Sequence, residues 1–97
     1  MSELLSAAAI QAHLEDLAGW TLEEGVLVRE DRPKDFRAAL AWINRVGMLA
    51  EQENHHPDFH LTSWNHVRLR LWSHDVGGLT ERDFNLARQI TKLAQPY

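Results

Sequence analysis

Histidines that could carry acid–base chemistry gather in the second half of the chain. Five of the six histidines fall between positions 55 and 74, namely His55, His56, His60, His66 and His74. An imidazole titrates near about pH 6.5, so two neighbouring rings can supply one proton acceptor and one proton donor at neutral pH. Such a pair suits a reaction that removes one proton from a substrate and places another on its leaving group.

The placement of three of these histidines favours this chemistry. His55 and His56 lie at the predicted end of a helix, whose partial negative charge favours a protonated ring. Glu51 precedes His55 by four residues, so its carboxylate could orient that ring on a helix. His74 ends a predicted strand and precedes a glycine-containing loop, which is a common place for a reacting side chain. An adjacent histidine pair at a helix end is, however, also typical of a simple cap or surface feature.

A metal site is the alternative interpretation of the same cluster. Imidazole is a common zinc ligand, and His55, His56 and His60 are closely spaced. Pro57 interrupts any helix that would bring His56 and His60 onto one face, and the chain has no cysteine. We therefore expect no metal site, and we expect His60 and His66 to be partly exposed sheet residues.

The composition excludes several classes of protein. The 97 residues fit a single domain over 1–97, and the net charge of −4 offers no general attraction to nucleic acid or to anionic lipid. The absence of cysteine excludes a disulfide scaffold and a thiol nucleophile. The first residues lack the basic region of a secretory leader, and no apolar run approaches the roughly 20 residues that span a bilayer. These features predict a cytoplasmic protein that binds neither nucleic acid nor membrane.

Hydrophobic periodicity predicts the elements that must position the histidines. Helices are expected at about 6–17, 36–54 and 81–94, with Ser6, Asp35 and Thr80 as their N-caps. Residues 20–22 and 26–30 form a predicted hairpin, and the stretch 59–73 forms two strands that turn near Asn65. Asp83 takes the capping-box position after Thr80. The predicted fold is α+β, in the order α-β-β-α-β-β-α, with a four-stranded antiparallel sheet whose helices pack on one face.

The helix predicted at 36–54 carries more apolar surface than one sheet contact needs. Its main stripe is formed by residues spaced three or four apart, which are Phe36, Leu40, Ile43, Gly47 and Ala50. Further apolar residues widen this surface, namely Trp42, Val46 and Leu49. The wide surface predicts self-association or binding of a partner protein.

A set of residues at fixed spacing runs through the second half of the chain: Glu51-x-x-x-His55-His56-Pro57, then Trp64, His74 and Asp83. This pattern resembles the signature of the pterin-4a-carbinolamine dehydratases. The flanking segments 54–59 and 73–83 are similar to the family as well, and the resemblance covers essentially the whole chain. It is specific, because several elements recur in order and not one short motif alone.

The resemblance implies an enzyme that dehydrates 4a-hydroxytetrahydropterin to quinonoid dihydropterin, which recycles the pterin of aromatic amino-acid hydroxylases. It implies no metal and no organic cofactor. It also implies that His55, His56 and His74 are the catalytic residues. We expect His56 and His74 to divide the acid and base roles, with His55 positioning the substrate or sharing in proton transfer.

The same resemblance implies a set of substrate-binding residues around these histidines: Glu51, Asn54, Phe59, Trp72, Ser73 and Arg82. Glu51 is the expected orienter, and Phe59 is expected to pack on the flat pterin. Arg82 either closes the site or ties the final helix to it. Trp72 departs from the pattern, because relatives usually place a small hydroxyl residue there. Strand parity puts Trp72 on the Arg70 face, which favours a solvent or subunit contact over a place in the site.

The resemblance also implies possible partners. Members of the family form homodimers and homotetramers, and some act as dimerization cofactors of a transcription factor through a helix surface. Direct contact with an aromatic amino-acid hydroxylase is a further possibility. The alternative to catalysis is therefore a non-catalytic binding protein that uses the face of the helix at 36–54.

Overall fold

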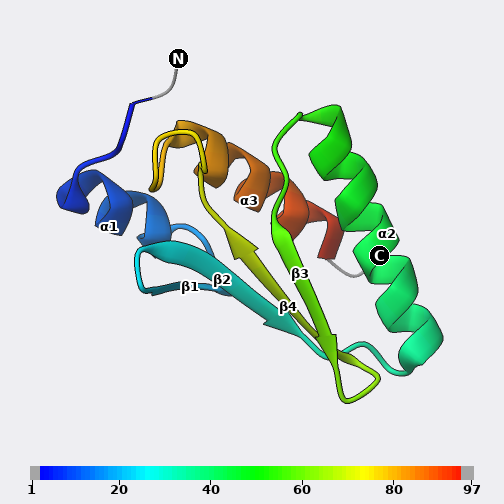
Figure 1. Ribbon diagram of the computed structural model, residues 1–97. Helices are drawn as coiled ribbons and strands as arrows, with labels where there is room; N and C mark the ends of the chain where they lie inside the picture. Colours follow the sequence, from blue (N-terminus) through cyan, green and yellow to red (C-terminus); the bar gives the residue numbers. More distant parts are fainter. Residues whose placement is uncertain (1–2, 95–97) are drawn as a thin grey trace.

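Helices and strands alternate in the order that the sequence predicts. The computed structural model describes residues 3–94 and contains α1 (Ala7–Glu15), β1 (Trp20–Glu23), β2 (Val26–Asp31), α2 (Phe36–Gln52), β3 (Asp58–Thr62), β4 (His66–Leu71) and α3 (Glu81–Ala94). The three helices lie on one side of the sheet (Figure 1). The predicted α+β class and element order are confirmed.

The helices begin where their capping residues predict. The Ser6 hydroxyl accepts the backbone N–H of Ala9 at 3.1 Å, and the Asp35 carboxylate accepts that of Ala38 at 2.8 Å. The Asp83 carboxylate accepts the backbone N–H of Thr80 at 2.8 Å, which is one half of the predicted capping box before α3, whereas the Thr80 hydroxyl accepts the N–H of Arg82 at 3.2 Å and not that of Asp83.

The four strands form one antiparallel sheet in the order β1-β2-β4-β3. Glu24 and Gly25 connect β1 to β2 with φ angles of 51° and 80°, as a tight hairpin turn requires. The register between β3 and β4 pairs Asp58 with Arg70 and Phe59 with Leu69. Phe59 therefore shares a face with Leu69, and Asp58 shares the opposite face with Arg70.

The core lies between the sheet and the helices. Alternate residues of β4 (Val67, Leu69 and Leu71) have no exposed surface, and they meet the fully buried Phe84 and Ile90 of α3. The other face of β4 is partly exposed, as predicted for a sheet that helices cover on one side only.

The buried face of α2 differs from the predicted stripe. Its buried residues are Ala39, Trp42, Val46 and Ala50. Phe36 and Leu40 were expected in the stripe, but they are 51% and 43% exposed. Trp42 and Val46 present more apolar area than Gly47, so the helix turns them towards the sheet. The prediction that Trp42 and Val46 extend a free surface is therefore wrong, and Met48, at 75% exposed, lies on the outer side instead.

No helix within residues 3–94 is both long enough and apolar enough to cross a membrane.

Candidate active site

The end of α2 separates two adjacent histidines. Asn54 adopts a left-handed conformation with φ of 52°. Its N–H donates to the Glu51 carbonyl at 3.1 Å, and the His55 N–H donates to the Ala50 carbonyl at 3.0 Å. This pair of bonds is a Schellman motif, which ends the helix and reverses the chain. As a result, His55 points into the protein and is buried, whereas the His56 side chain is 59% exposed.

The three predicted catalytic histidines line one pocket. The pocket has a volume of about 270 Å³ and lies between the end of α2 and the end of β4. Its lining consists of Asn54, His55, His56, Pro57, Asp58, Trp72, His74 and Asp75. Two segments that are distant in sequence therefore bring imidazoles to a single cavity, as acid–base chemistry on one substrate requires.

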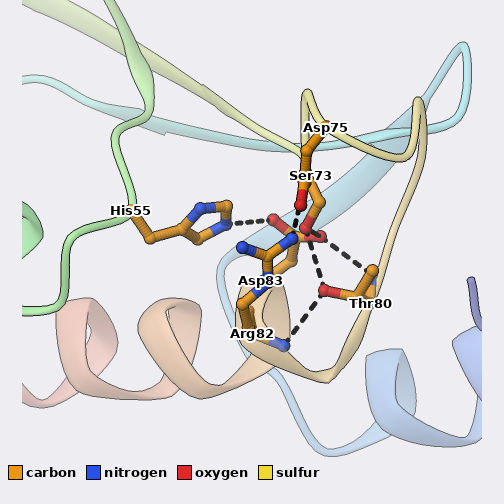
Figure 2. Close-up of polar contacts among 6 residues, drawn as sticks. All are labelled: His55, Ser73, Asp75, Thr80, Arg82 and Asp83. Atoms are coloured by element: carbon orange, nitrogen blue, oxygen red, sulfur yellow. Dashed lines mark hydrogen bonds and ion pairs between the residues drawn. The ribbon is translucent and has the colours of Figure 1, made fainter. Parts of the chain in front are cut away.

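His55 is held by a buried carboxylate. Its Nε2 lies 2.5 Å from Oδ1 of Asp83, whose side chain is fully buried in the first turn of α3. Figure 2 shows the ring reaching from the chain after α2 towards this carboxylate. Burying a carboxylate is unfavourable unless hydrogen bonds or an opposite charge compensate it. The other oxygen of Asp83 accepts the Ser73 hydroxyl at 2.9 Å and the Thr80 N–H at 2.8 Å.

These contacts connect both oxygens of Asp83 to their neighbours. Oδ2 of Asp83 accepts from the Ser73 hydroxyl and the Thr80 N–H, and Oδ1 faces Nε2 of His55. The Thr80 hydroxyl then donates to Ser73 Oγ at 2.8 Å, while it accepts the Arg82 N–H at 3.2 Å. Within His55, this leaves Nδ1 as the nitrogen that Asp83 does not occupy. A buried carboxylate that fixes the tautomer of an imidazole is a recurrent device in catalytic sites.

His56 is paired with Glu51, which corrects one prediction. Glu51 was expected to orient His55, but its carboxylate lies 2.8 Å from Nε2 of His56. The reason is the left-handed Asn54, which ends the helical geometry before His55. Glu51 is itself outside the lining of the pocket. Both side chains of this pair are largely exposed, at 59% and 79%, so water can exchange with the His56 ring.

His74 is held by an aromatic contact. Its ring centroid lies 4.1 Å from that of Trp72, with an angle of 35° between the ring planes. The Arg70 guanidinium lies 5.2 Å from the Trp72 ring centroid, which confirms that Trp72 is on the Arg70 face. Trp72 nevertheless lines the pocket, so its position does not support the preference for a solvent or subunit contact over a place in the site. The strand ends at Leu71, and the face that is open along β4 becomes a pocket wall beyond it.

Arg82 reaches the pocket through Asp75. Its guanidinium donates to the Asp75 carboxylate at 2.6 Å, as Figure 2 shows. This hydrogen bond is the main reason why the pKa of the Asp75 carboxyl lies below its ordinary value, and the charges of Arg82 and His55 act in the same direction. Arg82 does not line the pocket, so it ties α3 to the pocket rim rather than contacting the cavity itself.

Two further predicted substrate-binding residues, besides Glu51 and Arg82, lie outside the pocket. Phe59 packs against the core, because the register with β4 places it on the helix-covered face beside Leu69. Ser73 has no exposed surface and bonds to Thr80 and Asp83 beneath the pocket. The expectation that these two side chains line a substrate site is not supported by their positions, whereas Asn54 does line it.

Sequence reasoning missed Asp83 as a functional residue. It was assigned only to the capping box and to the family pattern, yet it also holds His55. Its carboxylate therefore has a double use, as a helix cap and as an imidazole partner. A signal was present, since the family pattern ends on this residue although capping alone would accept a glutamate or glutamine.

The remaining predicted histidines lie on the outer face of the sheet. His66 Nε2 is 2.6 Å from a carboxylate oxygen of Glu30, and His60 is exposed opposite Arg68. Their prediction as sheet residues is confirmed. Among residues 3–94, no three histidine, aspartate or glutamate side chains converge closely enough to hold a metal ion.

Comparison with known proteins identifies a family. Residues 3–93 match the family model described as pterin 4 alpha carbinolamine dehydratase. A relative from Thermosynechococcus vestitus, provisionally named pterin-4-alpha-carbinolamine dehydratase, is 45% identical over 94 residues, which are 97% of this chain and 98% of that protein. The mitochondrial pterin-4-alpha-carbinolamine dehydratase 2 of Arabidopsis thaliana is 42% identical over 93 residues. That alignment covers 92% of this chain but only half of the length of the plant protein.

A solved structure agrees with this result. A crystal structure from Brucella melitensis, described as a transcriptional coactivator/pterin dehydratase, superposes with a TM-score of 0.88 at 27% identity. The superposition covers 96% of this chain and the whole of that one.

Proposed function

The chain belongs to the pterin-4a-carbinolamine dehydratase family, a family of hydro-lyases, and from this premise we propose that it dehydrates 4a-hydroxytetrahydropterin by histidine acid–base catalysis. The product is quinonoid dihydropterin, and the reaction recycles the pterin used by aromatic amino-acid hydroxylases.

The reaction needs two proton transfers. Hydroxide is a poor leaving group, so the oxygen on C4a must gain a proton and depart as water. The N5–H proton is removed, and its electron pair forms the C4a=N5 double bond. Each positioned acid or base contributes roughly 10²- to 10⁴-fold to the rate of such a step.

One observation carries the proposal, namely that His55, His56 and His74 line the same pocket of about 270 Å³. The rings of His56 and His74 are both exposed at the pocket, so we assign the acid and base roles to this pair. His55 lines the cavity while Asp83 holds its Nε2, so Nδ1 is the nitrogen that Asp83 leaves available. This fixed ring positions the substrate or passes on a proton.

Stopped-flow decay of chemically generated 4a-hydroxytetrahydropterin tests the proposal. The wild type should accelerate the decay, and a His56→Ala/His74→Ala double variant should lose at least about 10²-fold of that acceleration. His60→Ala is the matched control, because its ring lies on the outer face of the sheet and should leave the rate unchanged. Equal acceleration by the wild type and the double variant would disprove the catalytic assignment.

A second candidate function is partner binding through the outer face of α2. The Brucella neighbour is described as a coactivator as well as a dehydratase, and Phe36, Leu40 and Met48 leave large apolar surface exposed on this helix. A second copy of the chain, in a homodimer or homotetramer, is the simplest occupant. Light scattering of the wild type and of Met48→Glu separates the cases. If the wild type is an oligomer and Met48→Glu dissociates it, the face serves self-association. If the wild type is a monomer, the face is left to another partner.

A further inference from the structure

Three side chains alternate along the end of β4 and beyond it. Arg70, Trp72 and His74 are spaced two apart, and the extended chain at the end of β4 places Arg70 and Trp72 on one face, while His74 begins the turn that follows. The Arg70 guanidinium, which precedes Trp72 in the chain, lies 5.2 Å from the Trp72 ring centroid. The His74 ring centroid, which follows it, lies 4.1 Å from the Trp72 ring centroid. The indole is therefore flanked by a cation and an imidazole.

This stack is anchored to the pocket. Arg70 lies 3.9 Å from the carboxylate of Asp58, which pairs with it across β3 and β4 and also lines the pocket. Trp72 and His74 line the same pocket. The indole thus has a fixed neighbour on the strand side and contacts a proposed catalytic ring on the pocket side.

His74 is held differently from the other two histidines. His55 has the Asp83 carboxylate and His56 has that of Glu51. Within residues 3–94, by contrast, the His74 side chain makes no hydrogen bond or ion pair with another residue, and its ring contact is with Trp72. The orientation of the His74 ring consequently depends on the indole.

We propose that Trp72 is the positioning residue for His74, which it holds by ring stacking so that both imidazole nitrogens stay open to the substrate and to water. The inference rests on the proposed proton-transfer role of His74. A carboxylate partner occupies one nitrogen and favours one protonation state. A stacked indole occupies neither nitrogen, and its electron-rich face accepts a neutral or a charged ring. This arrangement suits a group that must gain and lose a proton in every turnover.

Kinetics of three tryptophan variants test this role. Trp72→Phe keeps a flat ring and should stay within about threefold of the wild type. Trp72→Ser should lower kcat about 10- to 100-fold with little change in KM, because a misplaced catalytic group weakens the chemical step more than binding. Trp64→Ser is the matched control, since Trp64 is 67% exposed in the β3–β4 turn and away from the pocket. If Trp72→Ser does not fold, Trp72→Leu replaces it, because leucine keeps apolar bulk without an aromatic face.

A spectroscopic measurement tests the contact without catalysis. The carbon-bound ring protons of His74 should be shifted upfield by the indole in proton NMR of the wild type, and Trp72→Ser or Trp72→Leu should abolish the shift. The pH profile of kcat should also change for these variants and not for Trp64→Ser. An unchanged His74 spectrum together with an unchanged kcat in the variant would overturn the inference.

A His74→Ala variant separates this inference from the proposed function. If His74→Ala is inactive while Trp72→Ser and Trp72→Leu are fully active, the positioning role is wrong and the proposed function stands. If His74→Ala retains wild-type activity, the proton-transfer role of His74 fails, and the inference that depends on it fails as well.

Discussion

Two histidine–carboxylate pairs of nearly equal length lie in opposite parts of the molecule. Nε2 of His55 lies 2.5 Å from Oδ1 of Asp83 beneath the pocket, and Nε2 of His66 lies 2.6 Å from Oε1 of Glu30 on the outer face of the sheet. The side chains of the first pair are 10% and 0% exposed, whereas those of the second are 23% and 46% exposed. The distances alone do not distinguish the pairs, but the surroundings of each carboxylate do.

The buried carboxylate has fixed partners. Asp83 receives bonds from Ser73 and Thr80 besides His55, so no water competes and the imidazole has one orientation. Glu30 instead shares Arg68 with Glu23, whose hydrogen bond holds the pKa of Arg68 above its ordinary value. Such exposed ions exchange partners with water and contribute little. Burial, and not proximity alone, therefore determines whether a histidine–carboxylate pair holds its imidazole in one orientation.

Removing Asp83 should have the largest effect. Asp83→Ala takes away the partner of His55 and the cap of Thr80 together, so the free energy of unfolding should fall by about 3–5 kcal/mol. Asp83→Asn keeps the size of the side chain but not its charge, and it should lower kcat by at least about 10²-fold. Urea unfolding and stopped-flow kinetics measure the two effects. A stable, fully active Asp83→Asn variant would show that the carboxylate has no role beyond capping.

Removing the Ser73 hydroxyl should have an intermediate effect. Ser73→Ala leaves one oxygen of Asp83 with the Thr80 N–H alone, which costs about 1–3 kcal/mol for a buried polar group that loses a partner. The unfolding midpoint should shift, and kcat should fall less than in Asp83→Asn. If Ser73→Ala matches the wild type in stability, the Asp83 network is less tightly coupled than its geometry indicates.

Removing the charge of Glu30 should have a small effect. Glu30→Gln breaks an exposed ion pair, so the free energy of unfolding should change by less than about 1 kcal/mol and kcat should not change. The same two assays apply. A loss as large as that of Asp83→Ala would contradict the distinction between the buried and the exposed pair.

The smallest expected effect is a change in the pKa of the Asp75 carboxyl. The pKa of Asp75 lies below 3.8, chiefly because of the Arg82 hydrogen bond. The ionised Asp75 carboxylate therefore contributes its full stabilisation of the fold above pH 3.8, which is the ordinary pKa of this carboxyl. That stabilisation is lost as the pH falls through the lowered pKa of Asp75 in the folded protein. In Arg82→Gln the pKa should rise towards 3.8, which NMR of the Asp75 carboxyl carbon would detect. No rise in this variant would mean that another group lowers the pKa.

Local signals predicted most of the fold. The capping residues Ser6, Asp35 and Thr80 marked the starts of the helices, and alternation marked β4 with its inner and outer faces. The position of Phe59 could also have been predicted, because the parity that turns Leu61 inward turns Phe59 inward too. The predicted membership of His55, His56 and His74 in one site rested on the family resemblance, and the pocket that they share supports it without testing their roles.

The partners of the histidines could not be predicted from spacing. The pairing of Glu51 with His56 depends on the left-handed turn at Asn54, and a four-residue spacing assumes that the helix continues. The pairing of His55 with Asp83 joins residues 28 positions apart, so it needs the packing of α2 against α3. The rotation of α2 was mispredicted for a similar reason, because two overlapping apolar stripes compete and only the sheet selects between them.

The Schellman turn after α2 gives two identical neighbours unequal mutational tolerance. In a selection for folded protein alone, substitutions at His56 should be accepted widely, because its ring meets water and an exposed Glu51. Substitutions at His55 should be rejected, since each would leave Asp83 buried without its partner. A selection for activity should instead restrict both positions, so comparing the two selections would separate the structural from the chemical requirement within a single dipeptide.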